Sequence, residues 1–267
     1  MGTFERYVAI GDSMTEGLFD PDGNGGNRGW ADRLAEHLAA DGGAVLYANL
    51  AVRGRRAHEI HDQQLEPALA LEPDLVSVVA GMNDLLRPSF DVGWIMGYID
   101  RMFSAVTAAG AAVLTCTYGD PVPVNPYARV LRKRLDGFNA RLRAAAARHG
   151  AVLLDFAREP AVSDPRFWCE DRLHANAEGH RRIAAAAAEA LGVRVEGPRW
   201  NEQLPAAARK GRGEFIIGEL EWARRHLAPW VGRRFRRVSS GDGIEPKRPH
   251  LAPLGAEPDL PRDERSQ

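Results

Sequence analysis

Short apolar runs alternate with longer segments that carry a single apolar stripe, from about residue 6 to residue 192. Continuous apolar runs are typical of strands buried on both faces, and apolar residues at three- and four-residue steps are typical of helices. The runs predict strands at residues 7–10, 45–50, 75–80, 112–117 and 152–155. The stripes predict helices at residues 30–40, 56–70, 92–109, 127–148 and 176–191.

Strands that alternate with helices in this way indicate an α/β fold, in which helices cover both faces of a parallel sheet. Sites in such sheets lie beyond the carboxyl ends of the strands. Four loops follow the first four strands, at residues 11–17, 51–56, 81–90 and 117–126. We therefore expect the functional residues to come from these loops.

The pattern changes after residue 193. Residues 214–231 predict a further helix, and six arginines between residues 224 and 237 make its end basic. Beyond residue 238 the chain is rich in proline, glycine and charge, which is typical of disorder. We therefore expect an α/β domain at residues 1–193, a basic helical extension at 194–237 and a disordered tail at 238–267.

Composition excludes several classes of protein. The formal net charge of −1 gives no global field that would attract nucleic acid. The two cysteines, Cys116 and Cys169, have no metal-binding spacing. No signal-peptide pattern opens the chain, and no apolar stretch approaches the roughly 18 residues of a membrane span. We therefore expect a cytoplasmic protein.

A candidate nucleophile and a candidate base lie far apart in the chain. Ser13 follows Gly11 and Asp12 where the first strand is predicted to end, and Asp171-Arg172-Leu173-His174 lies far downstream. A serine hydroxyl needs a base to take its proton, and the base needs a third group to orient it. The three-residue spacing of Asp171 and His174 would put both side chains on one face of a helical turn.

Two further loops offer neutral hydrogen-bond donors. Gly54 follows the second strand, and its backbone N–H can donate to an oxyanion; Asn83 follows the third strand and carries an amide NH₂. Alone, each feature is more simply explained as a loop glycine or a helix cap. Together with Ser13, Asp171 and His174, they supply the parts of an acyl-transfer site.

Other chemistry-bearing residues have simpler explanations. His58 and His61 lack a neighbouring set of ligands and are expected on a helix surface. The glycine-rich stretch at residues 23–29 lacks the Lys-Ser/Thr of a phosphate-binding loop, so we expect a flexible loop bordering the site. Asp12 and Asp84 are expected to make local hydrogen bonds. We expect neither a metal nor a cofactor.

Four short blocks of this chain resemble those of the SGNH hydrolases, also called the GDSL esterase/lipase family. The blocks are Gly-Asp-Ser at 11–13, Asn-x-Ala-x-x-Gly at 49–54, Gly-x-Asn-Asp at 81–84 and Asp-x-x-His at 171–174. The resemblance covers roughly residues 6–192. It implies a flavodoxin-like, three-layer α/β/α sandwich with a five-stranded parallel sheet. It also implies a Ser13–His174–Asp171 triad with an oxyanion hole formed by Ser13, Gly54 and Asn83.

The expected function is hydrolysis of small-molecule carboxylic esters, most simply short-chain acyl or acetyl esters. Acyl transfer, lysophospholipase or thioesterase activity at the same site, and a non-catalytic acyl- or glycan-binding module, are the alternatives. Pro121, Val122, Pro123, Val124 and Tyr127 are expected to form an apolar wall of the substrate pocket.

The basic extension leaves three alternatives open. Its helix can pack on the catalytic domain, bind a partner, or touch an anionic membrane surface through residues 214–237. In the last case Trp222, Trp230 and Phe235 are the expected interfacial anchors.

Overall fold

The computed structural model describes residues 3–205, 218–229, 232 and 239–254. Its core is a six-stranded sheet with the strand order β5-β4-β3-β1-β2-β6. Strands β1 to β5 are parallel, and β6 joins the edge antiparallel to β2. The strands are β1 (Arg6–Gly11), β2 (Leu46–Asn49), β3 (Leu75–Val79), β4 (Ala112–Cys116), β5 (Val152–Leu154) and β6 (Arg248–Pro253).

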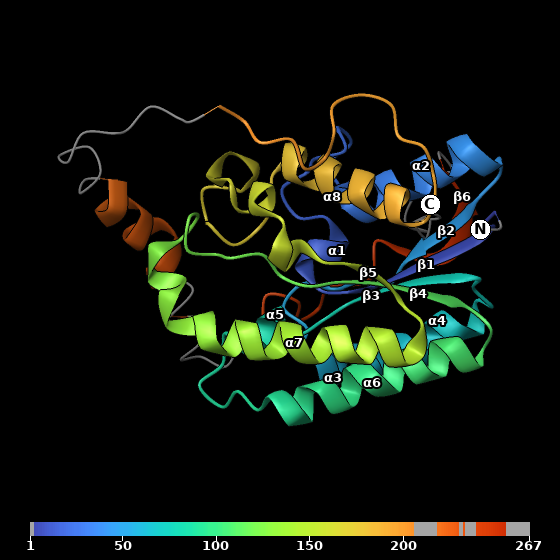
Figure 1. Cartoon of the computed structure of the whole chain (residues 1–267), viewed down its shortest axis with the longest axis horizontal. Coiled ribbons are helices and arrows are strands. Elements are labelled where there is room, and N and C mark those ends of the chain that lie inside the picture. The colour runs from blue at the N-terminus through green and yellow to red at the C-terminus, as the bar shows by residue number, and fades with distance from the viewer. Residues whose placement is uncertain (1–2, 206–217, 230–231, 233–238, 255–267) are drawn as a thin grey trace, which may run out of the picture.

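Helices cover both faces of the sheet, as the alternating pattern predicts. Figure 1 shows α2 and α8 on one face and α3, α4, α6 and α7 on the other. The longer helices of the two layers are α2 (Gly29–Gly42), α6 (Val92–Ala108), α7 (Arg132–His149) and α8 (Ala177–Ala190). Short helices α1 (Ser13–Glu16) and α5 (Met82–Leu85) directly follow β1 and β3. The α/β sandwich is therefore confirmed.

The predicted helix at 56–70 is continuous but contains a π-helical turn. It comprises α3 (Ala57–Ile60), the π-turn His61–Leu65 and α4 (Glu66–Ala70). Similarly, the predicted helix at 127–148 begins with the 3₁₀ turn Pro126–Leu131, because Pro126 is tolerated in a first turn, and continues as α7. Further 3₁₀ turns, Phe156–Arg158, Pro160–Ser163 and Pro165–Phe167, connect β5 to α8.

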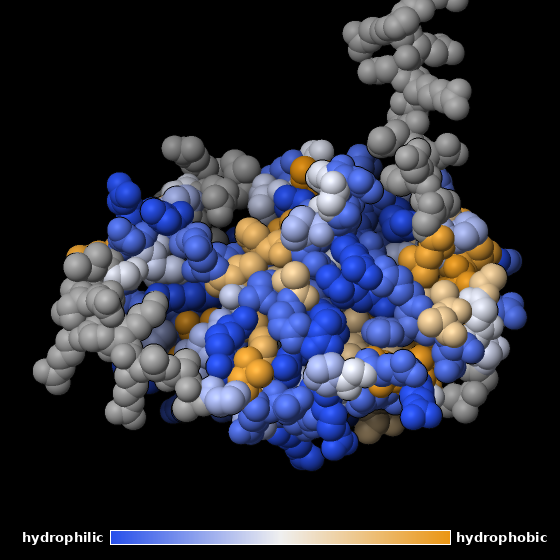
Figure 2. Space-filling view, turned by 90° about the horizontal axis from the view of Figure 1, so that it is seen from above, coloured by the Kyte–Doolittle hydropathy of each residue, from blue (hydrophilic) through white to orange (hydrophobic). Residues whose placement is uncertain are grey.

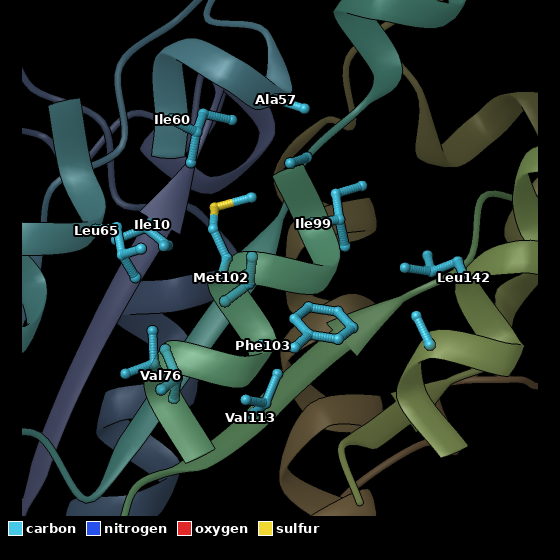
Figure 3. Packing of buried hydrophobic residues seen from close by; sticks show 14 of the residues in the cluster. Ile10, Ala57, Ile60, Leu65, Val76, Ile99, Met102, Phe103, Val113 and Leu142 are labelled. Atoms are coloured by element: carbon cyan, nitrogen blue, oxygen red, sulfur yellow. The ribbon is translucent and has the colours of Figure 1, made fainter. Parts of the chain in front are cut away.

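Two apolar clusters fasten the helical layers to the sheet. The cluster in Figure 3 contains Ile10, Val76 and Val113 of the sheet together with Ile99 and Phe103 of α6. On the other face α2 packs against the alanine-rich helix α8, whose small side chains allow a close approach. The outer surface seen from above is mostly hydrophilic, with hydrophobic residues in separate patches (Figure 2). None of the helices in the described part combines the length and apolar character needed to cross a bilayer.

The chain after residue 238 differs from the prediction of a disordered tail. Residues 239–254 are placed against the α/β domain, and β6 adds a sixth strand to the five that we expected. Pro249 and Pro253 cannot donate to a ladder, so the segment does not have the pattern of a strand, but an edge strand tolerates them. The prediction of a disordered tail is therefore wrong for residues 239–254. Residues 255–267 lie outside the described part of the chain.

Candidate active site

The turn after β1 is tightly packed at Gly11 and so fixes the position of Ser13. A Cβ at Gly11 would lie 2.6 Å from Thr15 Oγ1 and 2.8 Å from the Val79 carbonyl oxygen, so only glycine fits there. The buried Gln64 side chain accepts a hydrogen bond from the Gly11 N–H at 2.8 Å and donates to the Gly11 carbonyl at 2.9 Å. Asp12 caps α1 by accepting from the Met14 N–H. Ser13 is thus the first residue of a short helix on a fixed strand end.

The structure brings the three sequence-predicted residues Ser13, His174 and Asp171 together. His174 Nε2 lies 2.8 Å from Ser13 Oγ, and His174 Nδ1 lies 2.6 Å from Asp171 Oδ2. The other Asp171 oxygen accepts from the backbone N–H groups of Leu173 and His174. A hydroxyl, an imidazole and a carboxylate are therefore joined in one hydrogen-bonded line.

Asp171 and His174 do not share a helical turn, contrary to the sequence prediction. They lie in the loop before α8, and Arg172 between them has a φ of 59°. The Asp171 side chain folds back on the N–H groups that follow it, which is the local turn that aspartate favours. The three-residue spacing therefore brings the pair together through this turn and not through a helix.

The surroundings of Asp171 favour its charged form. Burial raises the pKa of this carboxyl, but the hydrogen bond and charge of His174, with the two backbone N–H groups, outweigh burial. The pKa of Asp171 is consequently below its ordinary value. A carboxylate that stays ionised can orient the imidazole and stabilise a positive charge on it.

The predicted donors Asn83 and Gly54 line a pocket together with Ser13. The Asn83 amide nitrogen donates to Asp12 Oδ2 and to the Arg55 carbonyl, each at 3.0 Å. Gly54 has a φ of 77°. Its loop is fixed by buried Glu16, which accepts from the backbone N–H of Arg53 at 2.7 Å and pairs with the Arg53 guanidinium.

Asp12 makes the expected local hydrogen bond with the Met14 N–H, but Asp12 and Asp84 also accept from residues that are distant in the chain. Asp84 accepts from the Ala57 N–H at 2.9 Å, and Asp12 accepts from Asn83. Burial raises the pKa of each carboxyl to about 6. No group of three or more potential metal ligands occurs among the described residues.

The other sequence candidates, His58, His61 and residues 23–29, are not among the residues that line the pockets at Ser13. The rings of His58 and His61 contact Tyr98 of α6, as surface helix histidines can. In the glycine-rich stretch, Asp22 accepts from the N–H groups of Asn24 and Gly26 and so forms a local turn. Gly29 packs so closely on Gly17 that a Cβ at 29 would lie 2.3 Å from the Gly17 Cα.

Two pockets meet at the candidate nucleophile. Both are lined by Ser13, Asn83 and His174; one has a volume of about 370 Å³ and the other of about 530 Å³. Of the predicted apolar wall, Pro121, Val124 and Tyr127 line the smaller pocket.

Sequence reasoning did not identify three side chains at the site. Gln64 fixes Gly11 from the π-helical turn, and π-turns occur often at functional sites. Arg172 and Trp222 line both pockets, and no motif marked them as site residues. Trp222, an interfacial anchor in the membrane-contact alternative, stacks its ring on Tyr127; Trp230 and Phe235 lie outside the described residues.

Comparison with known proteins agrees with this geometry. The model of the GDSL-like lipase/acylhydrolase family matches residues 9–182. Curated protein sequences give no significant match. Among solved structures, LAE5, an alpha/beta hydrolase enzyme from the metagenome of Lake Arreo, is 24% identical, with a TM-score of 0.60 over 71% of this chain and 95% of its own.

Two further solved structures share the fold at lower identity. Axe2, an acetylxylan esterase from Geobacillus stearothermophilus, is 18% identical, with a TM-score of 0.60 over 73% of this chain and 99% of its own. TesA is 21% identical, with a TM-score of 0.60 over 70% of this chain and 98% of its own. The family match covers more than half of the chain, and it includes Ser13, Gly54, Asn83, Asp171 and His174. The chain therefore belongs to the GDSL-like lipase/acylhydrolase family and is a hydrolase.

Proposed function

We propose that the protein hydrolyses small-molecule carboxylic esters through an acyl-enzyme on Ser13. The observation that carries this proposal is the hydrogen-bonded line from Ser13 Oγ through His174 to Asp171, with distances of 2.8 and 2.6 Å. With the Nδ1 proton donated to Asp171, His174 Nε2 has a lone pair free to accept the hydroxyl proton.

The proposed reaction has two steps. Ser13 Oγ attacks the ester carbonyl carbon while its proton moves to His174 Nε2, and the tetrahedral intermediate collapses as His174 returns that proton to the leaving alcohol. Water then attacks the acyl-enzyme, giving a proton to His174, and the acid departs as Ser13 regains its hydrogen. Asp171 stabilises the imidazolium in both steps.

We assign the oxyanion hole to the backbone N–H groups of Ser13 and Gly54 and to the Asn83 amide. Asn83 already donates to two acceptors, Asp12 and the Arg55 carbonyl, which hold its amide beside the nucleophile. One of these hydrogen bonds must be exchanged for a bond to the substrate. An oxyanion is a charged acceptor and forms a stronger bond than a neutral carbonyl does, so the exchange with the Arg55 carbonyl is favourable.

A Ser13→Ala variant tests the proposal. Because triad members act as a unit, loss of the nucleophile should lower kcat for p-nitrophenyl butyrate by roughly 10⁴–10⁶-fold. The wild type should also lose activity in proportion to labelling of Ser13 by an organophosphonate. Retention of more than a tenth of the wild-type rate by the variant would refute the assignment.

The same assay, with an added alcohol acceptor or with other substrates, separates the alternatives. A non-catalytic acyl- or glycan-binding module would neither turn over the ester nor bind the phosphonate covalently. Acyl transfer would use the same acyl-enzyme, so adding an alcohol acceptor would yield a new ester in place of the free acid. Thioesterase or lysophospholipase activity would appear as preferred turnover of those substrates by the wild type and loss in the variant.

A further inference from the structure

A helix outside the family match lies against the catalytic loop. Residues 218–229 are helical, whereas the match to the family ends at residue 182. Glu219 in this helix accepts two hydrogen bonds from the Arg172 guanidinium, at 2.6 and 2.9 Å. Arg172 lies between Asp171 and His174, so this paired contact attaches the helix to the loop that carries the base.

Trp222 strengthens the attachment. The Arg172 guanidinium lies 4.5 Å from the centre of the Trp222 ring, a distance at which cation and ring attract. The Trp222 ring also stacks on Tyr127, with centroids 6.0 Å apart and planes inclined by 13°. Tyr127 belongs to the loop predicted to shape the substrate pocket, so Trp222 bridges the loop of the base and the loop of the pocket wall.

One face of this helix is turned to the site. The residues of this helix that line the 530 Å³ pocket are Trp222, Arg225, His226 and Pro229. Because all four line the same pocket, they lie on one side of this helix, which contains the π-helical turn Ala223–Leu227. Leu220 lies outside this set and is 69% exposed. The helix therefore presents a defined set of side chains to the nucleophile.

Trp222 is the part of the helix that both pockets share. The 370 Å³ pocket is mainly apolar, with walls such as Val124, Leu131 and Leu135. The 530 Å³ pocket is more polar and includes Arg225 and His226. The Trp222 indole N–H is buried without a hydrogen-bond partner among the described residues. The Trp222 ring thus contributes a wall to each pocket, while its indole N–H makes no hydrogen bond within the described part of the chain.

We infer that Trp222 is a specificity-determining residue that closes the apolar pocket and makes the enzyme prefer esters of apolar acyl groups longer than acetyl. This inference rests on the proposed function, because it assumes acylation of Ser13. An apolar chain gains from burial in the 370 Å³ pocket, whereas an acetyl group has little apolar surface to bury there. The more polar pocket is then left for the alcohol part of the ester.

Chain-length profiles of point variants in the full-length protein test this inference. The kcat/KM would be measured for p-nitrophenyl acetate, hexanoate and dodecanoate with the wild type, Trp222→Ala, Trp222→Phe and Leu220→Ala. The wild type should prefer hexanoate to acetate, and Trp222→Ala should lower that preference roughly tenfold, since a hydrophobic pocket discriminates by such factors. The ratio of dodecanoate to hexanoate should rise, because the pocket is opened.

The other two variants make the result specific. Trp222→Phe keeps a ring on Tyr127 and should retain most of the hexanoate preference, whereas Leu220→Ala changes the exposed face and should leave the profile as in the wild type. Titration with an organophosphonate counts intact active sites and so corrects for any unfolded protein. A wild type that favours acetate, a Trp222→Phe profile like that of Trp222→Ala, or unchanged ratios in Trp222→Ala would overturn the inference.

Failure of this inference and failure of the proposed function give different results. If Ser13→Ala is inactive while Trp222→Ala keeps the wild-type ratios, the triad stands and only the role of Trp222 is lost. If Ser13→Ala remains active, the proposed function is lost whatever the ratios are.

Discussion

Asn83 donates its side-chain amide to the Asp12 carboxylate across 3.0 Å, although 71 residues separate them in the chain. Asp12 directly precedes Ser13 and is 2% exposed, so the strand end that carries the nucleophile also orients the proposed oxyanion donor. The amide of Asn83 is thereby held in place before a substrate arrives, which is the condition for electrostatic stabilisation of a transition state.

Replacement of Asn83 by alanine should therefore lower kcat strongly while leaving the fold intact. Loss of one oxyanion donor costs roughly 10²–10³-fold in kcat, while KM should change little because the donor acts mainly on the transition state. Steady-state kinetics with p-nitrophenyl butyrate and a thermal melt measure both effects. An unchanged kcat would show that Asn83 is not an oxyanion donor, which would leave the Ser13 and Gly54 N–H groups as the proposed donors.

The raised pKa of Asp12 predicts how stability depends on pH. Burial raises this pKa to about 6, whereas an aspartate in the unfolded chain titrates near ~3.9. Between these values the folded protein binds a proton that the unfolded chain has lost, so the free energy of unfolding should fall as pH rises from about 4 to about 6. Asp84, whose pKa burial also raises to about 6, acts in the same direction.

Asp12→Asn should remove about half of the fall in the free energy of unfolding between pH 4 and pH 6, a change on the order of 2–3 kcal/mol. Urea denaturation of wild type and variant at pH 4, 5, 6 and 7 measures the difference. Carboxyls with a lowered pKa, such as Asp171, stabilise the fold at pH values above their pKa in the unfolded chain. Both proteins contain these groups, so their contribution to the free energy of unfolding cancels in the comparison. Equal pH slopes in the two proteins would contradict the prediction.

A glycine beside the site gives a prediction about packing. Gly81 has a φ of 110°, and a Cβ there would lie 2.6 Å from Phe138 Cζ, so Gly81→Ala adds both backbone strain and a clash with a buried ring. The expected loss is about 3 kcal/mol in the free energy of unfolding. Gly137 is the matched control: it lies inside α7 with no atom within 4 Å of an added Cβ.

Gly137→Ala should stabilise the protein by about 0.5–1 kcal/mol, because alanine favours a helix over glycine. Chemical denaturation of both variants gives the two values. If Gly81→Ala were as stable as Gly137→Ala, the close contact between Gly81 and Phe138 would be wrong.

The sequence was sufficient for the parts of the fold that bury continuous apolar runs. Strands β1 to β5 and helices α2, α6, α7 and α8 follow the pattern, because burial on both faces of a sheet leaves a strong apolar signal. Motifs at three strand ends and before α8 also indicated which distant residues meet, since His174 and Ser13 are 161 residues apart and lie 2.8 Å from each other. Their local conformation was not predictable, as the turn at Arg172 depends on hydrogen bonds to Asp171.

Two features depend on contacts that no local pattern encodes. Strand β6 contains two prolines and few apolar residues, and its place follows from pairing with β2. The position of Trp222 follows from the ion pair between Glu219 and Arg172 and from stacking on Tyr127. The amphipathic pattern of the segment at 214–231 predicted a helix but could not select the surface that it covers.

Lys247 shows how the segment before β6 is held, and it supplies a test of that placement. Its ammonium lies 2.8 Å from Asp32 Oδ1 and donates to the carbonyl oxygens of Asn27 and Arg28. The Lys247 and Asp32 side chains are only 19% and 14% exposed. Lys247→Met would leave the Asp32 charge without its lysine partner. Such a loss lowers the free energy of unfolding by about 3–5 kcal/mol at a fully buried pair, and we expect about 2 kcal/mol at this partly exposed pair.

Lys133→Met is the matched control, because Lys133 is an exposed residue of α7 and such substitutions change stability by less than about 0.5 kcal/mol. Urea denaturation of the two variants should therefore separate them clearly. Adding Asp32→Asn to Lys247→Met should restore part of the loss, since the uncompensated charge is then removed. If Lys247→Met and Lys133→Met were equally stable, residues 239–254 would not be packed on the α/β domain in solution, and the sheet would end at β2.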